Sequence, residues 1–240
     1  MSKIIINSQV DVLPGRLPDF DQFTVKNEPM LFNCDLQGAR NLTGPLSGPI
    51  TNAVLNALPS TWREAPLVID TRVHMLMPGW YPCIPGWHHD DVPRTRADGQ
   101  PNYEDLGGNR SEHIVVLING DICPTEFALG EQEFNIPPIG EVVYEKWHHE
   151  MERRLNPSGP EYLIPETGLN RWTCPSNRLV KFNDRTWHRG TKARSGGWRY
   201  FFRASRYFNA AGESIPRGNP RTNETRRQVQ VYLDDPNKGW

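Results

Sequence analysis

The sequence predicts a mainly β protein: a double-stranded β-helix, or jelly roll, with a few flanking or inserted helices. Three observations favour this fold class. Short segments rich in β-branched and aromatic residues follow one another without the regular strand–helix alternation of a parallel sheet. The 22 prolines and 20 glycines indicate many turns rather than long helices. A chain of 240 residues, 37% of them hydrophobic, can bury one substantial core, so we expect a single domain over residues 1–240.

The first part of the chain predicts an arm, a helix and a strand. Residues 1–49 alternate short apolar runs with Pro, Gly and Asn, which indicates an N-terminal arm that wraps the core and contains one or two short strands. Residues 50–58 carry apolar side chains at helical spacing before a proline, which predicts a short helix packed on a sheet. Residues 67–77 are rich in β-branched residues and are followed by Pro-Gly, which predicts a strand.

The remaining strands complete a predicted core over residues 67–205. Residues 94–112 are polar and predict a surface excursion. Residues 140–157 place apolar side chains on one helical face and charged ones opposite, which predicts an inserted amphipathic helix. The C-terminal tail, residues 212–240, is polar and locally basic, which indicates loose order. Further strands are predicted at residues 113–118, 125–129, 178–183 and 198–205.

Composition excludes several classes of function. A net charge of −1 provides no overall attraction to nucleic acid or to an anionic membrane. The four cysteines are widely spaced without a Cys-x-x-Cys pair, which argues against a zinc ribbon and a dithiol redox centre. No apolar stretch approaches the length that spans a bilayer, so we expect a cytoplasmic protein without a membrane partner. The sequence gives no sign of an obligate protein partner.

The most informative motif is a His-x-Asp pair followed about a hundred residues later by a single histidine, His188. Two histidines and one carboxylate form the facial triad that holds iron(II) and leaves positions open for oxygen and a co-substrate. Because strand residues two apart point the same way, either His88 with Asp90 or His89 with Asp91 can supply the first two ligands. The residues alone leave both registers open.

Residues 67–205 resemble, in order and kind, the iron(II)/2-oxoglutarate-dependent oxygenase superfamily, including its phytanoyl-CoA-hydroxylase-like and prolyl-hydroxylase-like branches and related bacterial and phage proteins. The pattern that carries the resemblance is His-x-Asp, a long interval, His, and then an Arg in the next strand. It implies that His88 and Asp90, preceded by Trp87 as in several oxygenase families, are the proximal ligands. It also implies that His188 is the distal ligand and that Arg199 anchors 2-oxoglutarate.

The resemblance implies an enzyme, a 2-oxoglutarate-dependent dioxygenase that uses iron(II), O2 and 2-oxoglutarate, with ascorbate as the reductant in vitro. It would hydroxylate its substrate and release succinate and CO2. Halogenation is disfavoured, because halogenating relatives replace the metal carboxylate that Asp90 supplies here. Two alternatives stay open: a non-enzymatic jelly-roll binding module, and a cupin-like metalloenzyme that does not use 2-oxoglutarate. Arg199 argues against the cupin-like alternative.

An arginine suits the proposed anchoring role, because a guanidinium offers two parallel hydrogen bonds to a buried carboxylate. The rival to Arg199 is Arg203, which lies four positions on and on the same strand face. Near the metal motif, Trp80, Tyr81 and Trp87 are candidates for an apolar substrate-pocket wall that excludes water.

The substrate itself is only weakly indicated. A small molecule is the expected partner, with a nucleotide or nucleic acid as the alternative that a basic tail would favour. The tail cations are Arg217, Arg221, Arg226 and Arg227. The other histidines predict structural roles: His74 and His113 within strands, and His148 and His149 on the inserted helix.

Overall fold

The structure, a computed structural model, describes residues 2–40, 47–83, 85–105, 110–156, 168–216, 224–226 and 229–233. The strands of these residues are β1 Lys3–Ser8, β2 Asp11–Val12, β3 Met30–Phe32, β4 Val68–Leu76, β5 Arg110–Ile118, β6 Thr125–Asn135, β7 Asn170–Thr173, β8 Val180–Asn183, β9 Trp187–Gly190, β10 Gly197–Phe208, β11 Ser214–Ile215 and β12 Glu224–Arg226. The helices are α1 Gln22–Asn27, α2 Leu36–Ala39, α3 Pro49–Ala57, α4 Ser60–Arg63 and α5 Val143–Leu155, with a 3-10 turn, η1, at Gly120–Ile122.

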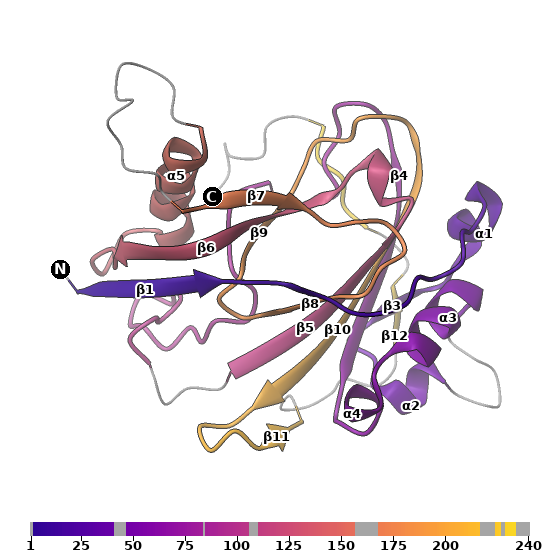
Figure 1. Cartoon of the computed structure of the whole chain (residues 1–240), viewed down its shortest axis with the longest axis horizontal. Helices are drawn as coiled ribbons and strands as arrows, with labels where there is room; N and C mark the ends of the chain where they lie inside the picture. The colour runs from indigo at the N-terminus through magenta and orange to yellow at the C-terminus, as the bar shows by residue number, and fades with distance from the viewer. Residues whose placement is uncertain are drawn as a thin grey trace.

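Two antiparallel sheets form the body of the protein (Figure 1). The larger sheet has the order β11-β10-β5-β8-β2, and β4 pairs with β10 on the side away from β5. The smaller sheet has the order β1-β6-β7, and β9 pairs with β6. A backbone bridge between His88 and His188 adds the segment around His88 beside β9.

The chain crosses between the sheets in the way that defines a double-stranded β-helix. It passes from β4 in the larger sheet to the His88 segment beside the smaller one, back to β5, and on to β6 and β7. It then returns to β8, crosses to β9 and ends the core in β10. The predicted fold class is therefore confirmed, with helices flanking the sheets as expected.

Strand β10 separates the larger apolar core, on the side of the helices, from the space between the two sheets. Tyr200, Phe202 and Ala204 are fully buried against an apolar layer that includes helices α3 and α4. The alternating residues Arg199 and Arg203 point to the opposite face, because successive strand residues point to opposite sides of a sheet. This alternation places the two arginines between the sheets, where a smaller apolar cluster that includes Leu117 and Phe127 also lies. The larger apolar core lies on the side of the helices, which Figure 1 shows.

Helix α5 lies against the smaller sheet, where Trp147 and Met151 pack with Phe134 and Trp187 in a second core cluster. The Trp147 indole donates a hydrogen bond from Nε1 to the Asn135 carbonyl at 2.9 Å, which ties the helix to the end of β6. The predicted helix over residues 140–157 therefore exists, slightly shorter, as an insertion between β6 and β7.

Other expectations need adjustment. The N-terminal arm contains helices α1 and α2 in addition to short strands, and Asp21 caps α1 by accepting from the Thr24 backbone N–H at 2.6 Å. The supposed surface excursion over residues 94–112 contributes Tyr103, only 1% exposed, to the core, and β5 begins within it.

Expectations for the C-terminal tail fall largely outside the described residues. Arg217, Arg221 and Arg227 lie there, and only the backbone of Arg226 is described, in β12.

A search of the described residues for a helix long and apolar enough to cross a membrane finds none.

Candidate metal centre

The two candidate histidine ligands face each other across a backbone bridge. The His88 N–H donates to the His188 carbonyl at 3.1 Å, and the His188 N–H donates to the His88 carbonyl at 3.2 Å. Their imidazole rings lie 4.5 Å apart between centroids. A reciprocal pair of this kind fixes both side chains on the same face, although a hundred residues separate them in sequence.

Each imidazole is oriented by its own neighbourhood. His88 Nδ1 lies 2.7 Å from the Gly86 carbonyl, and His188 Nδ1 lies 2.9 Å from the Thr186 carbonyl. A carbonyl only accepts, so both Nδ1 atoms carry the proton in these hydrogen bonds. The lone pair of each neutral ring is therefore on Nε2, the arrangement that metal-binding histidines adopt.

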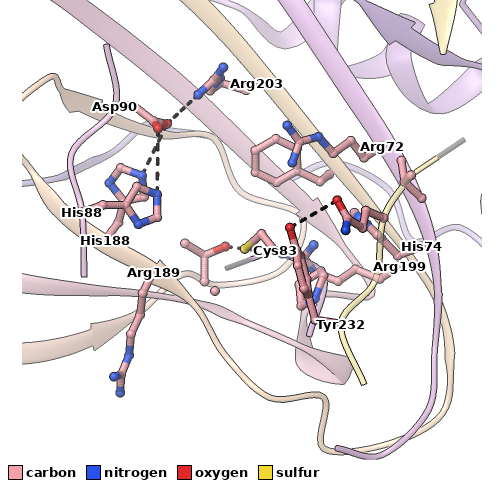
Figure 2. A pocket seen from close by; sticks show the side chains of 16 residues that line it. Arg72, His74, Cys83, His88, Asp90, His188, Arg189, Arg199, Arg203 and Tyr232 are labelled. Carbon is pink, nitrogen blue, oxygen red and sulfur yellow. Dashed lines mark hydrogen bonds and ion pairs between the residues drawn. The ribbon is translucent and has the colours of Figure 1, made fainter. Parts of the chain in front are cut away.

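Asp90 completes the cluster. Its carboxylate oxygens lie 3.9 Å from His88 Nε2 and 3.4 Å from His188 Nε2, and one ligand atom from each of the three residues lies within 4.8 Å of the others. Figure 2 shows the two rings side by side with the carboxylate above them. Two imidazole nitrogens and one carboxylate oxygen can hold a divalent metal on one face.

Charge near Asp90 keeps it ionised. Burial alone would raise its pKa, but the Arg203 guanidinium and, after it, His188 hold the pKa of the Asp90 carboxyl well below its usual value. The pKa of His88 falls to about 4, mainly because burial disfavours the imidazolium and secondarily because of His188. These pKa shifts keep Asp90 a carboxylate and His88 a neutral imidazole, which are the ligand forms that bind metal.

His89 and Asp91, the residues of the alternative register, make other contacts. His89, 4% exposed, lies with its ring centroid 3.8 Å from that of Trp187 and its Nδ1 2.5 Å from the Tyr103 hydroxyl. Asp91 has a positive φ of 56° and accepts a hydrogen bond from the Tyr207 hydroxyl at 3.0 Å. The structure thus brings His88 and Asp90 to His188, and turns the second pair away.

A cavity of about 400 Å³ opens beside the cluster. Arg199 lines it, only 2% exposed, with Nη2 donating to Thr125 Oγ1 at 3.3 Å. Its Nε is buried without a hydrogen-bond partner, and within the described ranges the guanidinium forms no ion pair. The rival Arg203 is engaged instead by Asp90 at 2.5 Å and by Asp70 at 3.6 Å.

The proposed aromatic wall needs correction. Trp87 is fully buried in the α5 core cluster, where its indole donates to Glu152 at 2.7 Å, so it is not part of the described cavity lining. Trp80 packs against Leu76 and Cys123 behind the site. Tyr81 pairs with Tyr232 through two backbone hydrogen bonds of 2.9 and 3.0 Å, and it is Tyr232 that reaches the cavity.

Several lining residues were not foreseen. Arg72 and His74 on β4 lie opposite Phe201 and Arg199 on β10, and all four line the cavity. A signal was present in the sequence, because Asp70, Arg72 and His74 put ionisable groups at every second position of the strand. The other unforeseen lining residues include Cys83, Thr125, Gly190, Gln230 and Tyr232.

The remaining histidines have contacts consistent with structural roles. His113, with no exposed surface, lies between the hydroxyls of Ser111 and Ser205 at 3.0 and 2.9 Å. On α5, His148 Nδ1 accepts from the Trp87 backbone N–H at 3.1 Å. His149 Nδ1 contacts the Glu145 carbonyl of its own helix at 2.7 Å.

No protein-family model and no curated protein matches this sequence. Solved structures with a similar course of the chain include EvdO2 from Micromonospora carbonacea var. aurantiaca complexed with 2-oxoglutarate, at 12% identity and a TM-score of 0.37, covering 87% of this chain and 72% of that one. HygX from Streptomyces hygroscopicus with nickel and 2-oxoglutarate bound is 13% identical, with a TM-score of 0.34 and 85% of each chain covered. An N-substituted L-amino acid dioxygenase from Burkholderia ambifaria AMMD is 13% identical, with a TM-score of 0.33. This chain spans 59% of the dioxygenase, which in turn covers 67% of this chain.

Proposed function

We propose that this protein is an iron(II)- and 2-oxoglutarate-dependent oxygenase that hydroxylates a small molecule. The observation that carries the proposal is the combination within one cavity of the His88, Asp90 and His188 cluster with Arg199, a buried guanidinium that forms no ion pair within the described part of the chain. A metal site alone fits many reactions. A metal site beside an uncompensated, forked cation fits a co-substrate with a carboxylate at each end.

The donor set suits iron(II). Two neutral imidazoles with Nε2 lone pairs and one ionised carboxylate would hold the metal through His88, His188 and Asp90. Iron(II), when bound, supplies the activation of O2 that couples decarboxylation of 2-oxoglutarate to oxidation of a C–H bond. The protein residues would fix the ligand geometry and keep Asp90 charged through Arg203.

Arg199 would hold the distal carboxylate of 2-oxoglutarate. Its position on β10, beside the cluster but not in contact with it, suits a co-substrate that reaches from the metal to a second charged group. Thr125 accepts a hydrogen bond from Nη2 and so limits the orientations of the guanidinium. A planar fork can then make two parallel hydrogen bonds that an ammonium cannot copy.

The direct test is anaerobic titration calorimetry of the purified protein with ferrous iron, and then of the metal-loaded protein with 2-oxoglutarate. Succinate release would be measured in parallel with iron(II), ascorbate and oxygen. Asp90→Ala should abolish metal binding, whereas Asp91→Ala, which removes the carboxylate of the other register, should retain it. Equal succinate from wild type and Asp90→Ala would trace the product to free iron.

The same experiments separate the alternatives. Absence of both metal and 2-oxoglutarate binding would favour a non-enzymatic jelly-roll binding module. Metal binding without any effect of 2-oxoglutarate would favour a cupin-like metalloenzyme.

A further inference from the structure

Two cations point into the cavity from neighbouring strands, and the proposed reaction uses only one of them. Arg72 on β4 lies directly opposite Phe201 on β10, two residues along the ladder from the Arg199 and His74 pair. Arg72 and Arg199 are therefore diagonal neighbours on the same face of the sheet. In Figure 2 both lie on the side of the cavity away from the His88 and His188 rings.

Among the described residues, Arg72 has no charged partner. It is half-buried, its Nε is buried without a hydrogen-bond partner, and it forms no ion pair with any residue that the structure describes. Its guanidinium makes a cation–π contact with Phe201, with the guanidinium carbon 5.8 Å from the ring centroid. A second cation beside Arg199 costs free energy through desolvation and like-charge repulsion, and an anionic ligand would offset that cost.

The other cations of the cavity already have anionic partners. Arg203 pairs with Asp70 and Asp90. Arg189 is held by Glu126 at 2.9 Å and by Glu152 at 2.5 Å. In the proposed function, the distal carboxylate of 2-oxoglutarate would neutralise Arg199. Asp90 and the other carboxylate of 2-oxoglutarate would neutralise the two charges of the metal, and Asp70 would neutralise Arg203. Among the arginines that the structure places on the cavity lining, Arg72 then remains without an anionic partner.

We propose that Arg72 binds an anionic group of the prime substrate, so that the substrate is a small carboxylate or phosphate ester. This inference rests on the proposed function, because it assigns Arg199 to 2-oxoglutarate. The substrate would lie over Phe201, between Arg72 and the metal cluster, with Gln230 and Tyr232 on the cavity lining beside it. Recognition of a charged group by Arg72 would orient the rest of the molecule towards the reacting centre.

The test uses matched anionic and neutral probes on the full-length protein loaded with manganese(II) and 2-oxoglutarate. The pairs are acetate and acetamide, benzoate and benzamide, and glycerol 3-phosphate and glycerol, with affinity measured by calorimetry and by thermal shift. We expect at least one anion to bind more tightly than its neutral counterpart. The carboxylate and phosphate pairs identify which anion the site prefers.

Three variants locate the effect. Arg72→Gln should weaken binding of the preferred anion by about tenfold or more, the loss expected for a charge-assisted hydrogen bond, while Arg72→Lys should lose less. Lys192→Gln, which removes an exposed cation near Tyr81, is the control and should leave the preference unchanged. Both Arg72 variants should still bind 2-oxoglutarate with the wild-type affinity.

Two results would overturn the inference. One is the absence of any anion preference in the wild type. The other is a loss of 2-oxoglutarate affinity in Arg72→Gln that matches the loss in Arg199→Gln, which would make Arg72 part of the co-substrate anchor. Failure of the proposed function looks different: the metal-loaded wild type would not bind 2-oxoglutarate, whereas an anion preference dependent on Arg72 would persist.

Discussion

Arg203 joins Asp90 to Asp70, with Nη1 2.5 Å from one carboxylate and Nη2 3.6 Å from the other. Asp70 lies directly opposite Arg203 in the β4–β10 ladder, so the guanidinium is held by the sheet and presented to the metal cluster. The side chain that rivals Arg199 for the proposed co-substrate role is therefore paired with two carboxylates, one of which belongs to the candidate metal centre. The ion pair with Arg203 therefore orients the Asp90 carboxylate without a bound metal.

Removal of this support should weaken metal binding. We expect Arg203→Gln to lower the affinity for manganese(II) by about 10- to 100-fold, the usual effect of losing a group that orients a metal ligand. Arg203→Lys should recover part of the loss because it restores the charge. Anaerobic calorimetry measures both. The control is Arg206→Gln, which breaks a comparable ion pair between Arg206 on β10 and Glu112 on β5 and should bind metal normally.

Arg199 should affect the co-substrate and not the metal. Arg199→Lys should weaken 2-oxoglutarate binding to the metal-loaded protein by about tenfold or more, because an ammonium cannot supply two parallel hydrogen bonds. Manganese(II) affinity should not change, since Arg199 does not contact Asp90. If the 2-oxoglutarate affinity is lost on Arg203→Lys and retained on Arg199→Lys, the roles of the two arginines are exchanged.

His113 should make the fold sensitive to acid. Burial lowers its pKa from 6.5 to about 4 in the folded protein, so the unfolded chain binds the proton more readily between these values. Its contribution to the free energy of unfolding is complete above pH 6.5 and is lost as the pH falls towards 4, by about 3 kcal/mol in total. Urea unfolding at pH 7.5 and 4.5 should show a smaller pH dependence for His113→Asn than for wild type.

Tyr103 should support His89 without affecting the metal. Tyr103→Phe removes the hydroxyl that contacts His89 Nδ1 at 2.5 Å and the Tyr144 hydroxyl at 3.2 Å, leaving buried polar atoms without that partner. We expect a loss of about 1–3 kcal/mol in the free energy of unfolding. Manganese(II) affinity should be retained in calorimetry. If Tyr103→Phe loses as much metal binding as Asp90→Ala, His89 would again be a candidate metal ligand.

The strands that carry the site were predictable because each has a local signature. The β-branched run of β4 and the aromatic-rich run of β10 are visible in the sequence alone. The choice between His88 and His89 as the first ligand could not be predicted from the residues alone, because both registers have the same spacing. It depends on the bridge to His188 and on the aromatic packing of His89, which are contacts between distant segments.

The substrate side of the cavity was the least predictable. Trp87 looked like a pocket wall by its position beside His88, but tertiary packing against α5 takes it into the core. Tyr232 lies far from the motif in sequence and reaches the cavity through its pairing with Tyr81. Arg72 carried a detectable signal in the polar face of β4, although only the register with β10 reveals that it neighbours Arg199.

Alternate side chains of β10 face two different environments. Positions 199, 201 and 203 line the cavity, whereas positions 200, 202 and 204 pack against the helical layer. Substitutions at Arg199 and Arg203 would therefore change the charge of the cavity without repacking the core on the helical side, provided that the pairing register is kept. A one-residue insertion within the strand would exchange the two sets and bury the arginines against apolar side chains. The charge and shape of the cavity can therefore change through substitutions along β10, whereas a change in the length of this strand would disrupt both of its faces at once.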